Sequence, residues 1–304
     1  MRLALTLLFA LSLMGATAQQ TLAEIHFESE NISSVIVQGV FCDVTVEPGR
    51  TTKIDGLIAG DGSPGDYEFV KSMDGGQLLI KVESRRTKNK WSWGSSRDSK
   101  IAVTLPEGVT LQIKNTSGDV QVERYTANTL DVQVTSGDVS LETINANLSL
   151  NATSGDLSVE GLTGDVTSKT TSGDQEFTSI KGNISVVATS GDLELAAVVG
   201  NITGQATSGD IEIEDAEGAI VLQTTSGDIS GEEVLITGDS RFKATSGDVE
   251  FELLNDFSDL SFDLKTSSGS LRAGAVKESK RLILEGGKFD VLGVTTSGSQ
   301  YFYE

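Results

Sequence analysis

The sequence predicts an all-β protein built mainly as a β-solenoid, and three observations support this fold class. The tetrapeptide TSGD recurs along the chain, and from Thr135 to Thr225 its step is always 18 residues. From Gly155 to Gly227, glycines follow one another every nine residues. Each turn is followed by an apolar, polar, apolar triplet, such as Leu157 to Val159, and this period of two is typical of a short, half-buried strand.

Each 18-residue step therefore predicts one coil of two short strands and two turns. A strand pair this short cannot bury its apolar face alone, so successive coils must stack on one another to form a continuous core. Left-handed hexapeptide helices also use 18 residues per coil, but they need an apolar residue at every sixth position, and Asp156 breaks that pattern here. The nine-residue spacing instead favours a flattened coil with two facing sheets.

Residues 1–18 predict a signal peptide. They contain one early arginine, an apolar run from Leu3 to Met14, and small residues at Ala16 and Ala18 in the arrangement that signal peptidase recognises. The mature chain would then begin near Gln19. The apolar run is too short for a membrane span, and no later segment approaches the roughly 20 apolar residues that a span requires. We therefore expect an exported protein, located in the periplasm, at the cell surface or outside the cell.

Residues 19–115 predict an irregular N-terminal β domain that caps the solenoid. Strand-like segments of uneven length are separated by turns at EPG, DGG and PEG. The single cysteine, Cys42, lies in phase with Val44 and Val46, so it is expected to face the core as a small hydrophobic residue. With one thiol the chain forms no internal disulfide.

Residues 116–250 predict the regular solenoid, in which each corner turns at a glycine with positive φ. Serine, threonine and aspartate side chains beside the glycines can bond to turn amides that have no partner in the sheet. The glycines assigned to the corners are Gly155, Gly164, Gly173, Gly182, Gly191, Gly200, Gly209, Gly218 and Gly227.

Residues 251–304 predict looser coils and a C-terminal cap, because the glycine step lengthens after Gly227. The aromatic residues Tyr301, Phe302 and Tyr303 offer enough apolar area to cover the last coil.

Stacked coils would also place aspartates in a file along one edge of the solenoid. Two such charges about 5 Å apart in water repel by only about 0.8 kcal/mol, so the file needs no metal to be tolerated. Calcium binding is the alternative, because calcium-binding β-rolls also use two nonapeptides per coil. Here only the spacing matches, since each nonapeptide has one glycine with the acid directly after it. The aspartates are Asp138, Asp156, Asp174, Asp192, Asp210 and Asp228.

A basic segment at residues 85–100 interrupts the acidic character of the chain. Exposed tryptophans beside cations are suited to stacking on sugar rings and to pairing with anionic groups. Alternatively, the segment is a hairpin whose tryptophans cover the end of the solenoid and whose cations discourage edge pairing. The candidate ligand-binding residues are Arg85, Arg86, Lys90, Trp91 and Trp93.

The formal net charge of -21 disfavours nucleic acid as a partner of the whole chain. Catalysis requires a unique cluster of groups, whereas identical acids in a file offer many equivalent places. The only histidine, His26, lies near the mature N-terminus, and no motif for a nucleophile, a metal or a phosphate is present. We therefore expect no enzyme activity and no cofactor.

Several segments carry a resemblance to a known family: VQGVFCDVTVEPG, DGGQLLIKV, IAVTLPEG and the serial TSGDV and GN turns. With these segments the chain resembles the exported bacterial "putative adhesin" family of β-strand repeat proteins, which is related to the head-GIN domains. The resemblance covers most of the mature chain. It implies a solenoid-like all-β fold, export, an adhesive role and no catalytic residues.

The functional hypothesis is an exported, non-enzymatic β-solenoid that acts as an adhesin or a cell-envelope binding protein through an acidic repeat surface. Its partner would be an envelope or surface ligand, either a glycan or a protein. Two alternatives remain open at this point: a structural envelope spacer or scaffold without a specific ligand, and a calcium-binding β-roll.

Overall fold

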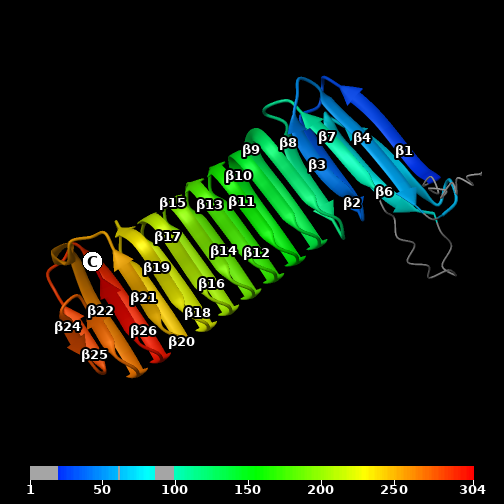
Figure 1. The fold of residues 1–304 in the computed structure, drawn as a ribbon. Helices are drawn as coiled ribbons and strands as arrows, with labels where there is room; N and C mark the ends of the chain where they lie inside the picture. The colour runs from blue at the N-terminus through cyan, green and yellow to red at the C-terminus, as the bar shows by residue number, and fades with distance from the viewer. Residues whose placement is uncertain (1–19, 61, 86–98) are drawn as a thin grey trace, which may run out of the picture.

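The computed structural model describes residues 20–60, 62–85 and 99–304, and they form an elongated stack of β-strands (Figure 1). The predicted signal peptide lies outside the described residues. In the described part of the chain, all regular structure is β except for one 3₁₀ turn, η1 (Phe257–Asp259). The predicted fold class, an all-β solenoid preceded by an irregular β region, is confirmed.

The central coils repeat with the predicted step of 18 residues. Leu157 pairs in parallel with Gln175, and Gln175 pairs with Leu193 one coil further on. Alternate strands along the chain belong to two different sheets, which we call sheet 1 and sheet 2, so each coil contributes one strand to each. The strands β9 and β10 are long enough to give their first half to sheet 1 and their second half to sheet 2.

The central strands of sheet 1 are β11 (Leu157–Thr163), β13 (Gln175–Lys181), β15 (Leu193–Val199), β17 (Ile211–Gly218), β19 (Ile229–Ile236) and β21 (Val249–Leu253). Those of sheet 2 are β12 (Val166–Ser172), β14 (Ile184–Ser190), β16 (Ile202–Ser208), β18 (Ile220–Ser226) and β20 (Ser240–Ser246). The shared strands are β9 (Val120–Ser136) and β10 (Val139–Ser154).

The side chains that point between the two sheets form one continuous hydrophobic core. Most are β-branched or leucine, as expected of strands buried on one face. Gln175 is a polar exception, and its side chain is satisfied inside the core: Ser168 Oγ donates to Gln175 Oε1 at 2.5 Å, and Gln175 Nε2 donates to Thr170 Oγ1 at 3.0 Å. The alternation predicted from the sequence thus sets which face of each strand is buried.

Sheet 1 has one feature that the sequence pattern did not predict. In β11, β13, β15, β17 and β19, a single residue with positive φ interrupts the alternation, so that in β11 Leu157, Val159 and then Leu162 point inward. Neighbouring strands carry this residue at the same position, so they stay in register across it: Glu160 pairs with Thr178, and Leu162 pairs with Ile180. Including those of β9 and β10, the positive-φ residues are Arg124, Thr143, Gly161, Ser179, Ala197, Asp215 and Glu233.

Corner glycines allow neighbouring coils to approach closely. Gly191 has a φ of +117°, and a Cβ atom on it would lie 2.2 Å from the carbonyl oxygen of Gly173 in the preceding coil. The predicted positive φ holds for eight of the nine assigned glycines; Gly218 is the exception, although its Cβ would also lie 2.0 Å from Gly200 O. Contact between coils, as well as backbone conformation, therefore demands glycine.

The N-terminal strands extend both sheets, but not in chain order. Their bounds are β1 (Gln20–Ser29), β2 (Ser34–Val40), β3 (Asp43–Pro48), β4 (Thr52–Gly60), β5 (Tyr67–Asp74), β6 (Gln77–Ser84), β7 (Lys100–Leu105) and β8 (Thr110–Asn115). In sheet 1 the order is β1, β4, β7, β3 and then β9. In sheet 2 it is β5, β6, β2, β8 and then β9.

The coil formed by β2 and β3 is therefore enclosed between later segments of the chain, and the antiparallel strands β1, β4 and β5 close this end of the stack. Cys42 lies between β2 and β3 and is fully buried, as predicted. Burial raises the pKa of its thiol to about 12, so Cys42 stays protonated as a core side chain.

The C-terminal strands show the same rearrangement at the other end. They are β22 (Leu260–Ser268), β23 (Leu271–Ala273), β24 (Val276–Glu278), β25 (Arg281–Leu284), β26 (Phe289–Ser297) and β27 (Gln300–Tyr303). The last coil in the chain, β26 and β27, inserts between β20/β21 and β22/β23. The antiparallel strands β24 and β25 lie outermost.

The prediction that Tyr301 to Tyr303 cover the end of the solenoid is therefore wrong. Phe302 is fully buried, and its ring lies between those of Phe251 and Phe262, with centroids 5.8 Å and 5.4 Å away. Phe302 fills the core of an interior coil, whereas Tyr301 and Tyr303 are only half-buried, because the chain passes outward to β22 and then returns.

Replacing Gly191 by alanine tests the contact between corners. We expect a loss of about 2–4 kcal/mol in the free energy of unfolding, because the Cβ atom adds overpacking against Gly173 to the strain of positive φ. Gly75→Ala is the matched control, since Gly75 has a φ of +54° with no atom within 4 Å of its Cβ position. It should lose about 1 kcal/mol. Equal losses in chemical denaturation would show that coil contact does not matter.

Deleting residues 288–304 tests the order of the coils. The deletion removes β26 and β27, so β20 and β22 each lose one neighbouring strand, and β22 keeps only the short antiparallel strand β25. Hydrogen exchange followed by mass spectrometry should show that amides in Leu260–Ser268 lose most of their protection, while Gln175–Lys181 stays protected. Unchanged protection in Leu260–Ser268 would contradict the inserted position of β26.

Candidate binding surface

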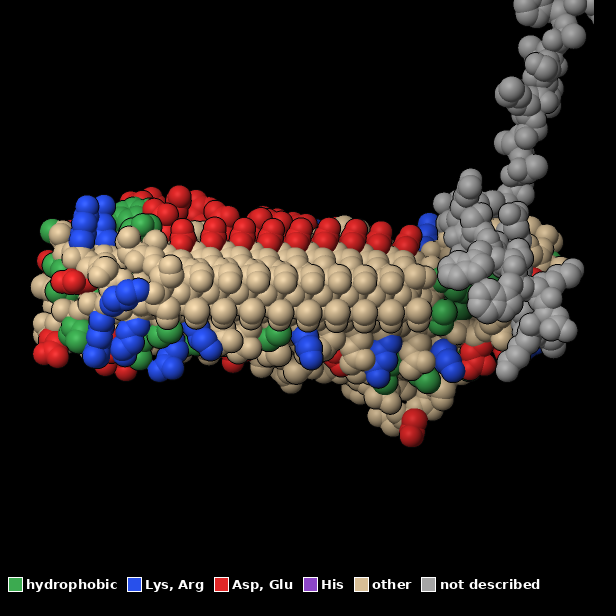
Figure 2. Space-filling model, turned by 90° about the horizontal axis from the view of Figure 1, so that it is seen from below, with side chains coloured by type: hydrophobic (Ala, Val, Ile, Leu, Met, Phe, Trp, Pro, Cys, Tyr) green, Lys and Arg blue, Asp and Glu red, His purple; other side chains and the backbone are tan. Residues whose placement is uncertain are grey.

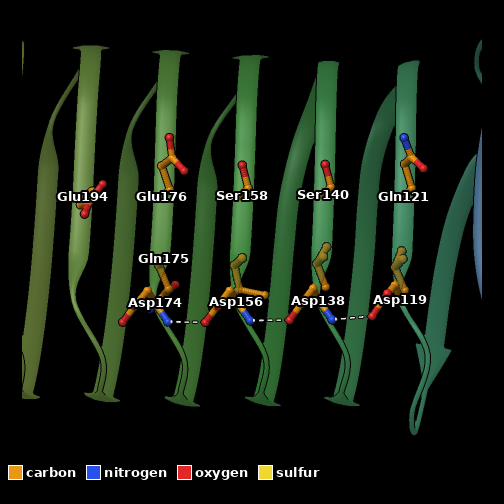
Figure 3. Close-up of a pocket in the computed structure, with 13 residues that line it drawn as sticks. Asp119, Gln121, Asp138, Ser140, Asp156, Ser158, Asp174, Gln175, Glu176 and Glu194 are labelled. Atoms are coloured by element: carbon orange, nitrogen blue, oxygen red, sulfur yellow. Dashed lines mark hydrogen bonds between the residues drawn. The ribbon is translucent and has the colours of Figure 1, made fainter.

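The aspartates of the TSGD turns form a hydrogen-bonded ladder along one edge of the solenoid. The backbone N–H of Asp192 donates to Asp174 Oδ1 in the preceding coil at 2.9 Å, and the N–H of Asp210 donates in turn to Asp192 Oδ1 at 2.8 Å. Figure 3 shows three further links, from Asp119 to Asp174. At one end of the ladder, Asp119 N–H donates to Asp43 Oδ1. At the other end, Ser299 N–H donates to Asp248 Oδ1 and Ser270 N–H donates to Ser299 Oγ, so the ladder follows the spatial order of the coils and not the chain order.

The local backbone explains why a residue with a side-chain acceptor follows the corner glycine. Around this corner, Gly191 N–H donates to Ser208 O and Leu193 N–H donates to Asp210 O, both in the following coil. The N–H of Asp192, between them, donates to the preceding coil, where the aspartate side chain supplies its acceptor. The expectation that turn side chains bond to amides without a sheet partner is thus confirmed.

The opposite corner shows that the bond itself does not require a charge. There Asp165 N–H donates to Asn147 Oδ1, and Asn201 N–H donates to Asn183 Oδ1. Asparagine supplies the same acceptor as aspartate. The TSGD edge therefore carries negative charge beyond what its hydrogen bonds need.

The structure also bears on the calcium alternative. Each aspartate of the ladder uses one carboxylate oxygen for the next coil, as Asp174 does for Asp192. Among the residues that the structure describes, no group of three or more acids, histidines or cysteines is placed to hold a metal ion. In the described edge the aspartates thus act as acceptors for backbone amides.

Beside the aspartate ladder, the outer face of sheet 1 forms a shallow groove of about 580 Å³. Outward side chains follow one another across the strands, with Glu176 paired to Glu194 and Glu194 to Glu212. The polar groove lining that Figure 3 labels is Asp119, Gln121, Asp138, Ser140, Asp156, Ser158, Asp174, Gln175, Glu176 and Glu194. We call this groove together with Glu212 the acidic face.

Sequence reasoning identified the aspartates but missed the glutamates of the acidic face. The signal was present, since Glu176, Glu194 and Glu212 are spaced by one coil length and must therefore stack. Figure 2 shows the result as continuous rows of acidic side chains along the solenoid, separated by an uncharged band from scattered lysines and arginines.

Crowding of like charges affects Glu194 most clearly. Its pKa is raised above the ordinary value, first by desolvation and then by the neighbouring charges of Glu176, Glu212, Asp174 and Asp192. The ionised form of Glu194 is therefore less favourable in the folded protein than in the unfolded chain.

The predicted tryptophan site can be examined only in part. Arg85 is exposed and forms an ion pair with Glu68, which raises the pKa of Arg85. The other four predicted residues, Arg86, Lys90, Trp91 and Trp93, lie outside the described residues.

The only histidine, His26, is exposed and pairs with Asp55 at 2.5 Å. Across residues 20–60, 62–85 and 99–304, the structure contains no helix with the length and hydrophobicity that a membrane span requires.

A family model, Toastrack DUF4097, matches residues 40–221 and 205–291 of the chain. The chain belongs to this family. The matched residues include the coils that carry the aspartate ladder and the acidic face, and the resemblance noted in the sequence is confirmed at the level of family.

Two solved structures of low sequence identity are also similar. One is a putative adhesin from Bacteroides fragilis, with 11% identity over 92% of this chain and 96% of that chain, at a TM-score of 0.31. The other is a putative cell adhesion protein from Clostridium sporogenes, with 8% identity over 92% and 99% of the two chains, at a TM-score of 0.19. A comparison with curated proteins found no match.

The pair Asp174→Asn and Asp174→Ala separates the hydrogen bond from the charge. Asparagine keeps an acceptor for Asp192 N–H and removes a repulsion of about 0.8 kcal/mol per near neighbour, so Asp174→Asn should be as stable as the parent or more so. Alanine removes the acceptor and should cost about 0.5–1.5 kcal/mol. Urea denaturation measures both. An equal loss in the two variants would contradict the ladder's structural role.

Glu194→Gln should raise the melting temperature at pH 7. Because the folded-state pKa of Glu194 is raised, its ionisation costs stability above that pKa, and the cost disappears as the pH falls and Glu194 binds a proton. The advantage of Glu194→Gln should therefore shrink as the pH is lowered from 7 toward 4. A difference that stays constant or grows over this range, in calorimetric melts, would rule out the raised pKa.

Proposed function

We propose that this protein is an exported, non-enzymatic adhesin or cell-envelope binding protein that engages its partner through the acidic face. The observation that carries the proposal is the groove of the acidic face, where equivalent acids recur in each of several coils. The surplus charge on the TSGD edge supports it, because asparagine serves the same structural purpose on the opposite edge.

The spacing of the acids suits a partner with several basic groups. Stacked strands lie about 4.8 Å apart, so the solenoid presents its acids at a fixed interval on a rigid support. Each exposed contact is weak, but linked contacts raise the overall affinity because later contacts form within one complex. A row of lysine or arginine side chains on a surface protein, or of amino groups on a glycan, would fit this arrangement.

The same uniformity argues against catalysis. General acid and base catalysis depends on groups whose environments push their pKa values apart. The aspartates of the ladder instead occupy equivalent positions and make the same bond, as Asp156, Asp174 and Asp192 show. A binding role uses such repetition, whereas a reaction centre does not.

Binding to isolated bacterial envelope fragments tests the proposal. Labelled protein beginning at Gln19 should bind saturably, and unlabelled protein should compete. The triple variant Glu176→Gln, Glu194→Gln and Glu212→Gln removes three charges from the acidic face with little change in shape, and we expect at least tenfold weaker binding.

The matched control removes three charges from sheet 1 outside the groove, through Glu214→Gln, Glu232→Gln and Glu252→Gln. It should bind within about twofold of the parent. Binding that rises linearly without saturation would favour a spacer or scaffold without a specific ligand. Saturable binding that both triple variants retain equally would place the binding site away from the acidic face.

A further inference from the structure

The outer face of sheet 2 differs in charge from the acidic face. One file of outward side chains crosses the stack in register, each residue paired with the next on the neighbouring strand. Its members are Gln38, Lys114, Gln133, Asn151, Lys169, Val187, Gln205, Gln223 and Lys243. None of these nine is an acid, although the chain has 44 acidic and only 23 basic residues. We call this file the amide-lysine file.

The first part of this file lines a groove of about 740 Å³. The groove extends from Gln38 to Lys169, and a parallel row of threonines lies along it: Thr116, Thr135, Thr153 and Thr171. The groove residues project from the strands β2, β8, β9, β10 and β12 and from the corners that follow them. The groove thus runs along the solenoid axis, across the strands.

The two lysines of the groove are available for a ligand. Lys114 and Lys169 are both exposed, and within the described structure neither forms an ion pair. The register places them three coils apart, which is about 14 Å at the usual strand spacing. Between them lie Gln133 and Asn151. The amide of Asn151 can donate and accept hydrogen bonds, whereas Gln133 Nε2 already donates to the carboxylate of Asp131 at 3.3 Å, so Gln133 offers its amide oxygen as an acceptor.

This spacing discriminates between polymer classes. An extended peptide places side chains on one face every 6.6–6.8 Å or so, which does not match steps of about 4.8 Å. Successive units of an extended 1,4-linked polysaccharide repeat close to the strand spacing, and their hydroxyls can bond to amides and threonines. Carboxylates on some of the sugars would meet the lysines.

We propose that the groove on sheet 2 binds a linear polysaccharide containing uronic acids, laid along the solenoid axis between Lys114 and Lys169. Sugar carboxylates pair with the two ammonium groups, and sugar hydroxyls bond to Gln133, Asn151 and the threonine row. This site lies on a different sheet from the acidic face and does not depend on the function proposed for that face.

Titration with oligogalacturonates of defined length tests the site on the full mature chain. Oligomers long enough to span three coils, of four or more sugars, should bind at least tenfold more tightly than the dimer. The double variant Lys114→Gln and Lys169→Gln should weaken binding of the long oligomer at least tenfold. The matched control Lys181→Gln and Lys277→Gln removes two charges elsewhere and should stay within about twofold.

Two comparison polymers separate this site from general charge attraction. Polyglutamate carries carboxylates on a peptide backbone, and a neutral 1,4-linked glucan carries sugar units without charge, so both should bind at least tenfold more weakly than the uronate oligomer. The proposal is overturned if polyglutamate binds as tightly, if the neutral glucan binds as tightly, or if Lys114→Gln with Lys169→Gln leaves uronate affinity unchanged. Circular dichroism melts should confirm that both double variants fold.

Discussion

The close approach of successive coils at the glycine corners is the constraint on which this structure depends. A side chain at Gly191 would collide with the backbone of Gly173, and the same contact recurs from coil to coil. Because the corners must coincide, the coils from Gly137 to Gly227 all have 18 residues, and coils with 19 or 20 residues place the additional residues between the corners. The aspartate ladder then satisfies the one corner amide that the sheets leave without a backbone acceptor.

The fixed register between coils determines which side chains lie next to one another on the surface of the solenoid. Residues one coil apart stand beside each other, so a preference at one position of the repeat becomes a row along the solenoid. Glutamates at one position give the acidic face on sheet 1, and amides with lysines at another give the amide-lysine file on sheet 2. The partners that we propose for the two rows are extended polymers of opposite charge.

The central coils could be predicted from the sequence because their contacts are local in the repeat: turn chemistry and the alternation of apolar residues determine strand, corner and core. The ends could not. Whether Phe302 covers the last coil or fills an interior one depends on which strand β26 joins, and nothing in its own sequence distinguishes β20 from β22. The positive φ of Ser179 was also missed, since positive φ outside glycine has no clear sequence signal. The glutamate row was predictable, because its members share the repeat spacing.

Deleting whole or half coils tests most directly whether corner register governs the fold. Removal of residues 211–228, one full coil, keeps the partners of the buried Gln175 and leaves every later corner stacked on a corner of its own kind, so the protein should melt cooperatively within a few degrees of the parent. Removal of residues 220–228 alone places TSGD corners against the corners of the other edge, and it should lower the melting temperature by far more although fewer residues are lost. Equal melting temperatures for the two deletions, or a larger loss for the full coil, would contradict the account.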